Sequence, residues 1–308
     1  IARRQRQMCI RDSSYAMRGS SVYQQTLNLT ISEKQKLRRL LEENYLPKNR
    51  VYRYNFFYDN CTTRARDIIE KCIEGKVVYS EGKERLSFRD IVHQYTKGHE
   101  WDELGIDMCL GSEADKPIDT RKQMFAPFYM LEAAKKATIV VGDSVRPLIL
   151  HEKKVVDVEP EDVREGFPLS PMVCVFILIG VTCFVGWLQF KIRKIIWIWD
   201  LLLFGVQGLA GCVITFLVFF STHPTVGSNW LILLLNPIPL IYLPVMVYRA
   251  IKGKKDYYHT INIVCLTSFM MIMPFIQQKF NVTVLPLALC LLICSANHVL
   301  LYYRQNNK

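Results

Sequence analysis

The sequence predicts an α+β soluble domain followed by an all-α membrane domain of five helices, and three observations support this. The chain has 308 residues, enough for two domains of about 150 residues each. It carries 39 basic and 28 acidic residues, yet only twelve of these charges come after position 170. The second half consists instead of apolar runs of about 20 residues, the length that an α-helix needs to cross a bilayer.

The soluble half alternates between extended and helical patterns. Strands are predicted at 20–29, 51–57 and 77–79, with two short β runs inside 138–158. Helices are predicted at 30–43, from about 60 to 73, at 87–95 and at 120–137. Loops are predicted at 44–50 and 104–115. Thr30 and Glu33 form a capping-box pattern, Asp59 or Asn60 can cap the second helix, and Ser87 can cap the third.

The ends of the soluble domain are predicted from composition. Residues 1–13 are basic, begin without Met and precede no apolar signal segment, and the string resembles a translated sequencing adapter. We therefore expect a non-native leader at 1–13 and a periplasmic domain at 14–158 whose native start is missing. A Pro- and acid-rich linker is expected at 159–168, and the membrane domain at 169–308.

Five membrane spans are predicted in the second half. They cover residues 169–190, 195–221, 230–248, 260–277 and 282–303. The third span contains Pro237, Pro239 and Pro244, so a kinked or broken helix is expected there. Asp200 lies near one end of the second span, where Lys191 to Lys194 are its expected partners.

Basic residues predict the orientation of these spans. The loops after the first and third spans and the C-terminal tail hold nine Lys and Arg residues, whereas the alternate loops hold only Lys279. The positive-inside rule then makes the C-terminus cytoplasmic and the soluble domain periplasmic, in a bacterial inner membrane. Because this asymmetry explains much of the net charge of +11, a nucleic-acid partner is disfavoured.

Cys61 is the strongest candidate for chemistry. It is expected in the first turn of a helix, where free backbone amides and the helix dipole favour a thiolate, and Arg64 adds to that field. The alternatives are a buried structural cysteine or a disulfide. Cys61 and Cys72 cannot pair, because eleven residues on one helix separate them by about 16 Å. Pairing with Cys109 stays open. The spacing of Cys and His does not favour zinc.

Other polar residues are weaker candidates. Asp59 and Asn60 can orient a base or line an oxyanion hole, although the cap is favoured for Asn60. His93 is a candidate base on an amphipathic helix, where a surface histidine is the commoner case. A further set at an expected outer loop can contact a phospholipid head group or an amine, or can simply be polar loop residues. That set is His223, Asn229 and Asn236.

The motifs resemble one bacterial family. YRYNFFYDNCTTRARDII, WDELGIDMCLGSEAD and QMFAPFYMLEAA are similar to the Lnb N-terminal periplasmic domain, and FFSTHPTVGSNWLILLLNP to the membrane domain attached to it, with Bacteroidota-like relatives. The resemblance implies a lipoprotein N-acyltransferase that moves a phospholipid acyl chain to the amino group of a diacylglyceryl-cysteine. No cofactor and no metal are implied.

The resemblance also implies a fold and a catalytic arrangement. The soluble domain is expected to be papain-like, of the permuted NlpC type, with Cys61 as the nucleophile. In such folds a His precedes the Cys, but no His occurs before His93 here, so the base either lies upstream of Ile1, which we favour, or is His93. A membrane-tethered cysteine amidase or peptidase and a non-enzymatic envelope protein are the alternative functions.

Overall fold

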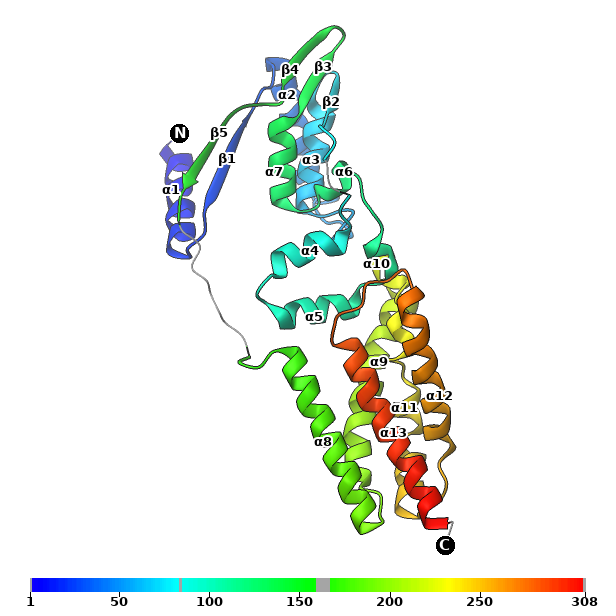
Figure 1. The fold of residues 1–308 in the computed structure, drawn as a ribbon. Coiled ribbons are helices and arrows are strands. Elements are labelled where there is room, and N and C mark those ends of the chain that lie inside the picture. The colour runs from blue at the N-terminus through cyan, green and yellow to red at the C-terminus, as the bar shows by residue number, and fades with distance from the viewer. Residues whose placement is uncertain (1, 83–84, 159–166, 307–308) are drawn as a thin grey trace. The chain divides into compact units, whose positions relative to one another are not determined.

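The computed structural model describes residues 2–82, 85–158 and 167–306, with the side chains of residues 2–9 and 306 left out. The chain divides into two units (Figure 1). The first contains residues 1–91 and 117–165, and the second contains 92–116 and 166–308. Residues 92–116, expected in the soluble domain, thus group with the apolar helices. Most of the expected linker, 159–166, lies outside the described residues.

The first unit combines helices with two small antiparallel sheets. Its helices are α1 (Ala2–Met17), α2 (Ile31–Tyr45), α3 (Cys61–Cys72), the start of α4 (Phe88–Thr96), α6 (Thr120–Gln123) and α7 (Pro127–Lys136). Its strands are β1 (Val22–Leu27), β2 (Lys76–Val78), β3 (Thr138–Val141), β4 (Ser144–Pro147) and β5 (Ile149–Val156). Strand β1 pairs with β5, and the second sheet has the order β2-β3-β4.

Two apolar clusters hold this unit together. One joins α2, α3 and α7 to the second sheet through Cys72, Ala134, Ile139 and Leu148 and their neighbours. The other is aromatic: the Phe57 ring centroid lies 4.5 Å from that of Phe88 and 5.0 Å from that of Phe125. Aromatic pairs at these separations add to the gain from burial. The second cluster therefore fixes the chain just before α3.

A buried carboxylate ties the first unit together. Glu33, in the first turn of α2, accepts hydrogen bonds from the backbone N–H groups of Thr30 and Glu74. The Arg146 guanidinium binds both of its oxygens, at 2.6 and 2.7 Å. Burial by itself raises the pKa of Glu33, but the hydrogen bonds from Thr30, Glu74 and Arg146 outweigh it and lower that pKa below its ordinary value.

We expect Glu33→Gln to lower the free energy of unfolding of this unit by about 2 kcal/mol at pH 7, because it leaves Arg146 without its charged partner. A carboxyl with a lowered folded-state pKa stabilises the protein above its unfolded pKa of about 4.5, and that stabilisation is lost as the pH falls. The difference in stability between the wild type and Glu33→Gln should therefore become smaller below pH 4.5, as measured by thermal denaturation from pH 3 to 7. A gap that stays constant would contradict this account.

The second unit contains five long apolar helical segments, which confirms the predicted number of spans (Figure 1). They cover Pro171–Ile192, Trp197–Phe220, Pro224–Ile251, Tyr257–Phe275 and Val284–Gln305. The segments consist of α8 (Pro171–Ile192), α9 (Trp197–Phe220), α10 (Pro224–Gly227), η2 (Trp230–Leu233), α11 (Ile238–Ile251), α12 (Tyr257–Ile272), η3 (Met273–Phe275) and α13 (Val284–Asn306).

The third span is broken, as its prolines predict. It comprises α10, η2 and α11, with Pro237 at the N-cap of α11 and Pro244 inside that helix. The break brings the backbone of Asn236 against α9, where a Cβ at Gly211 would lie only 2.2 Å from the Asn236 carbonyl carbon. Only glycine permits this approach.

Residues 92–116 form the end of α4, α5 (Glu100–Cys109) and η1 (Ser112–Asp115). Within the second unit they are hydrogen-bonded to the loop around α10. The Gly111 N–H donates to the Thr225 carbonyl at 2.7 Å, and the Ser112 N–H donates to the Ser228 carbonyl at 3.1 Å. The prediction of a loop at 104–115 is wrong for residues 104–109. These residues belong to α5, which continues through the glycine at 105.

A polar cluster is buried among the membrane helices. Asp200 on α9 is hydrogen-bonded to His298 Nε2 on α13 at 2.7 Å, and both side chains are almost wholly enclosed. The His298 ring stacks on His259 with centroids 3.8 Å apart, and the Cys294 thiol donates to Asp200 at 3.4 Å. The predicted pairing of Asp200 with Lys191 to Lys194 is wrong, because one helical face of α13 supplies the partners instead.

Local signals predicted several elements well, and the exceptions have physical causes. The capping box of α2, the start and end of α3 and the strand β1 are confirmed. The predicted helix at 120–137 is interrupted between α6 and α7, where Pro127 begins the second helix. The stretch 138–158 forms three strands rather than two. Helix α1 covers the expected leader, and the assignment of 1–13 as non-native stays a prediction.

Candidate active site

Cys61 is the first residue of α3, and its side chain is exposed. The helix begins there because Asn60 caps it: the Asn60 Oδ1 accepts from the N–H groups of Thr62 and Thr63, each at 2.9 Å. In return the Asn60 N–H donates to the Thr63 hydroxyl at 2.8 Å, which completes a capping box. Its exposure excludes the interpretation of Cys61 as a buried structural cysteine.

Asn60 also fastens two neighbouring segments to the helix start. Its Nδ2 donates to the Phe56 carbonyl at 2.8 Å and to the Phe125 carbonyl at 2.9 Å. The side chain is buried and uses both its oxygen and its nitrogen in these contacts. Asn60 therefore acts on Cys61 by fixing the backbone geometry around it, in agreement with the cap favoured from the sequence.

Asp59 and Arg64 form a pair beside Cys61. The Arg64 guanidinium donates to both Asp59 oxygens, at 2.7 and 2.9 Å, and lies 3.4 Å from the centroid of the Tyr52 ring. A bidentate arginine–carboxylate pair stacked on an aromatic ring holds a fixed geometry. Because both Asp59 oxygens bind Arg64, the pair ties the residue before the Asn60 cap to the first turn of α3.

The segment before Cys61 forms an aromatic surface rather than the predicted strand. Residues 51–60 pair with no strand in the described residues, and the Asn55–Asp59 bridge folds the segment into a turn. The turn buries Phe57 and leaves Tyr54, Phe56 and Tyr58 exposed. One edge of the Phe56 and Tyr58 rings still contacts the aromatic cluster, with Phe56 5.9 Å from Phe125 and Tyr58 5.3 Å from Phe88 between ring centroids. Exposed aromatic rings beside an exposed thiol offer apolar surface to a substrate.

Tyr54 is an electrostatic neighbour of Cys61. Burial, then the charges of Cys61 and of Tyr52, raise the pKa of the Tyr54 phenol above its ordinary value. Tyr54 therefore keeps its phenol proton more firmly than an isolated tyrosine does. Neither Tyr52 nor Tyr54 was selected as a site residue from the sequence.

Cys72 and Cys109 differ from Cys61 in their surroundings. Cys72 and Cys109 are free thiols, and burial raises the pKa of each. Neutral thiols are poor nucleophiles. Cys61 is likewise a free thiol.

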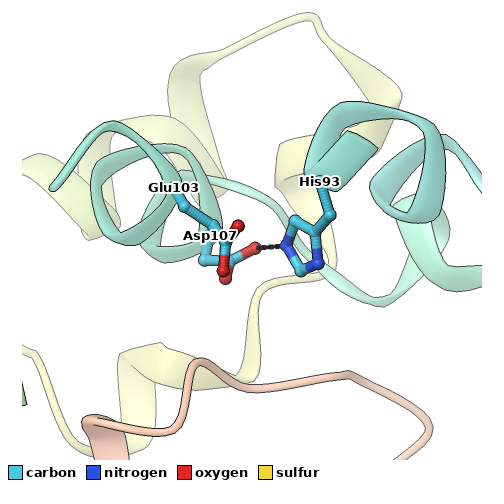
Figure 2. A group of neighbouring side chains, drawn as sticks. All are labelled: His93, Glu103 and Asp107. Atoms are coloured by element: carbon cyan, nitrogen blue, oxygen red, sulfur yellow. Dashed lines mark hydrogen bonds and ion pairs between the residues drawn. The ribbon is translucent and has the colours of Figure 1, made fainter. Parts of the chain in front are cut away.

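His93 belongs to a second polar site, shown in Figure 2. Its Nε2 lies 2.8 Å from an oxygen of Asp107, to which it is hydrogen-bonded, and Glu103 lies beside them. His93 is on α4, and both acidic residues are on α5, four positions apart and hence on one helix face. Neither acidic residue was selected from the sequence, because Asp107 fell in the loop predicted at 104–115 and no element was predicted for Glu103.

The outer-loop candidates occupy three different positions. Asn229 is buried, caps η2 through the Leu231 N–H and donates to the Met108 carbonyl at 2.7 Å, so it shapes the loop. Asn236 accepts from the Ile238 N–H at the break in the third span. His223 is half-buried and precedes α10, without a capping hydrogen bond from its side chain.

The structure groups the candidates into two sets. Cys61, Asn60, Asp59 and Arg64 come together at the start of α3 in the first unit. His93 and the outer-loop candidates lie in the second unit. The first set has an exposed sulfur, a capped helix N-terminus and an aromatic surface, which suit nucleophilic attack on an acyl group.

These features define a multi-pass membrane protein with a folded domain outside the bilayer. Family models identify both parts: the Lnb N-terminal periplasmic domain matches residues 10–97, and the Lnb transmembrane domain matches residues 162–306. Together the two matches cover most of the chain, which belongs to the Lnb family. No curated protein and no solved structure matches the chain. Family membership indicates a membrane-bound enzyme related to lipoprotein modification.

Proposed function

We propose that this protein is an N-acyltransferase that uses Cys61 as a nucleophile. The acyl donor is a phospholipid, and the acceptor is the α-amino group of a diacylglyceryl-cysteine lipoprotein. The observation that supports this most strongly is the exposed Cys61 at the start of α3, directly after a turn that exposes the rings of Tyr54 and Phe56. A long acyl chain needs apolar surface near the reacting sulfur, and these rings provide it.

The reaction divides into two transfers. The Cys61 thiolate attacks the ester carbonyl, a C–S bond forms, and the C–O bond to glycerol breaks as the lysophospholipid leaves with a proton. The amine of the acceptor then attacks the thioester, forming a C–N bond and releasing the thiolate, while the amine proton passes to a base. No oxidant, reductant or cofactor enters this balance.

The helix start contributes to the oxyanion site in this proposal. The N–H groups of Thr62 and Thr63 already bind Asn60, which leaves the Cys61 N–H as the backbone donor of this turn among the described residues. A donor within hydrogen-bond distance of the developing oxyanion lowers the barrier of acyl transfer. Asp59 and Arg64 act as positioning residues that hold the Tyr52 side of the site in place.

The general base is proposed to be a histidine that precedes Cys61 in the complete protein, as in the permuted papain-like folds. His93 is the second position that the sequence offers, and its Nε2 is already hydrogen-bonded to Asp107. The lipid-contact role of His223, Asn229 and Asn236 is supported best at His223, because Asn229 and Asn236 both cap backbone turns.

The function is tested with the purified full-length protein, phospholipid carrying a labelled acyl chain, and a diacylated lipoprotein. We expect labelled triacylated lipoprotein and an equal amount of lysophospholipid. A cysteine amidase or peptidase would instead cleave an envelope peptide and leave the lipid intact, because water would take its acyl group. Peptide cleavage without acyl transfer would overturn the proposal in favour of that alternative.

The proposed topology places the soluble domain in the periplasm and the C-terminus in the cytoplasm of a bacterial inner membrane. We expect a periplasmic reporter fused at Thr225 to be active and the same reporter at Lys254 to be inactive, because the basic residues gather on the Lys254 side. A cytoplasmic reporter at the same two positions provides the reciprocal control. Periplasmic activity at Lys254 would reverse the orientation.

A further inference from the structure

We propose that His93, Glu103 and Asp107 form a binding site for a divalent transition-metal cation. Each residue offers one ligand atom, and the three atoms all lie within 4.8 Å of one another. Figure 2 shows the imidazole of His93 and the two carboxylates converging from facing helices. This site lies wholly within the second unit and does not depend on the proposed acyl transfer.

The local fold brings the three ligands together. Glu103 and Asp107 are one turn apart on α5, so their side chains leave the helix on the same face. The short connection from α4 to α5 reverses the chain at Gly98, whose φ of +88° only glycine adopts without strain. The reversal turns His93, near the end of α4, toward that face.

The donor chemistry selects the class of cation. One imidazole nitrogen and two carboxylate oxygens suit Zn²⁺, Mn²⁺ or Fe²⁺ better than Ca²⁺ or Mg²⁺, which prefer oxygen ligands alone. Asp107 is buried, with 3% of its side chain exposed, and Glu103 is partly buried beside it. Two carboxylates held this close repel each other, and a cation between them relieves that repulsion.

A second layer of hydrogen bonds orients the carboxylates. The Thr96 hydroxyl donates to Glu103 Oε2 at 3.1 Å, and the Asn281 Nδ2 donates to Asp107 Oδ2 at 3.0 Å. Each carboxylate thus accepts a hydrogen bond from a neutral donor, and in Asp107 the remaining oxygen, Oδ1, is the one that binds His93. Outer hydrogen bonds of this kind are typical of metal sites, where they set ligand orientation and affinity.

Binding of a cation at this place would have two effects. Asn281 lies between the fourth and fifth spans, so the bound ion would link α4 and α5 to that loop of the membrane domain. Three protein ligands also leave coordination positions open to water or to an oxyanion. A metal on Nε2 occupies the nitrogen that now binds Asp107, which assigns His93 to ligation rather than to the role of general base.

Binding is tested on the detergent-purified full chain, freed of metal with a chelator and carrying no polyhistidine tag. After equilibration with Zn²⁺ or Mn²⁺ alone and dialysis, we expect one ion per chain by elemental analysis, and the Mn²⁺ sample should show a bound-ion EPR signal. In His93→Gln and Glu103→Gln the affinity should fall at least tenfold, since even an outer-layer change costs about 10–100-fold.

Matched controls come from the start of α5. His99→Gln and Glu100→Gln change exposed residues of the same types, and both variants should bind the ion as the wild type does. If a ligand variant does not purify, Thr96→Val removes one hydroxyl from the outer layer and should weaken binding about tenfold. The proposal is overturned if the wild type binds neither ion at micromolar concentration, or if folded cluster variants bind as tightly as the controls.

Discussion

Replacing Cys61 by serine in the full-length protein is expected to lower the rate of lipoprotein N-acylation by about 10³-fold or more. The hydroxyl nearly matches the thiol in size, but it is far less nucleophilic at neutral pH. Because Cys61 is exposed at the start of α3, the substitution leaves the core untouched and the fold should persist. The measurement is the initial rate of triacylated lipoprotein formation at saturating phospholipid.

Cysteines with a different environment provide the controls for that experiment. Cys109→Ala and Cys72→Ala should retain the transfer, because both thiols are held neutral by burial and neither begins a helix. Cys72→Ala should cost some stability, since Cys72 is fully buried in the first unit. Transfer at the wild-type rate in Cys61→Ser would remove Cys61 from the mechanism.

The second large effect is expected in the membrane domain. His298→Leu should lower the free energy of unfolding by about 3 kcal/mol or more, because it leaves the Asp200 carboxylate buried without its 2.7 Å partner. The stacking of His298 on His259 is lost as well. The measurement is denaturant-induced unfolding in mixed micelles, followed by tryptophan fluorescence.

Two further variants separate charge from packing in this cluster. Asp200→Asn keeps an oxygen near His298 and should destabilise the domain less than His298→Leu. His223→Leu changes a half-buried histidine of a loop and should shift stability by no more than about 0.5 kcal/mol. If His298→Leu were as stable as His223→Leu, the buried pair would contribute nothing to the fold.

The parts of the fold that could be predicted are those specified by residues close to one another in the sequence. The capping box of Thr30 and Glu33, the Asn60 cap of α3 and the five apolar runs each involve residues within a few positions or a single continuous segment. The 51–57 strand failed because alternation alone does not supply a pairing partner. Phe57 is buried through contacts with Phe88 and Phe125, which are distant in sequence.

The candidate site divides in the same way. Cys61 and Asn60 were predictable because a helix start and its cap are written in five consecutive residues, DNCTT. The carboxylates beside His93 were not, since they depend on α5 forming in a segment with a glycine and on a chain reversal at Gly98. The partner of Asp200 likewise comes from a helix 98 positions away, which no local pattern indicates.

Transfer through Cys61 requires an acyl-enzyme intermediate, a thioester on its sulfur. Full-length protein is incubated with phospholipid and no lipoprotein acceptor, then digested and analysed by mass spectrometry. We expect an acyl chain on the peptide that contains Cys61, which neutral hydroxylamine should remove and which should be absent in Cys61→Ala. A protein that stays unlabelled on Cys61, yet still converts diacylated lipoprotein to the triacylated form, would show that Cys61 is not the acyl carrier.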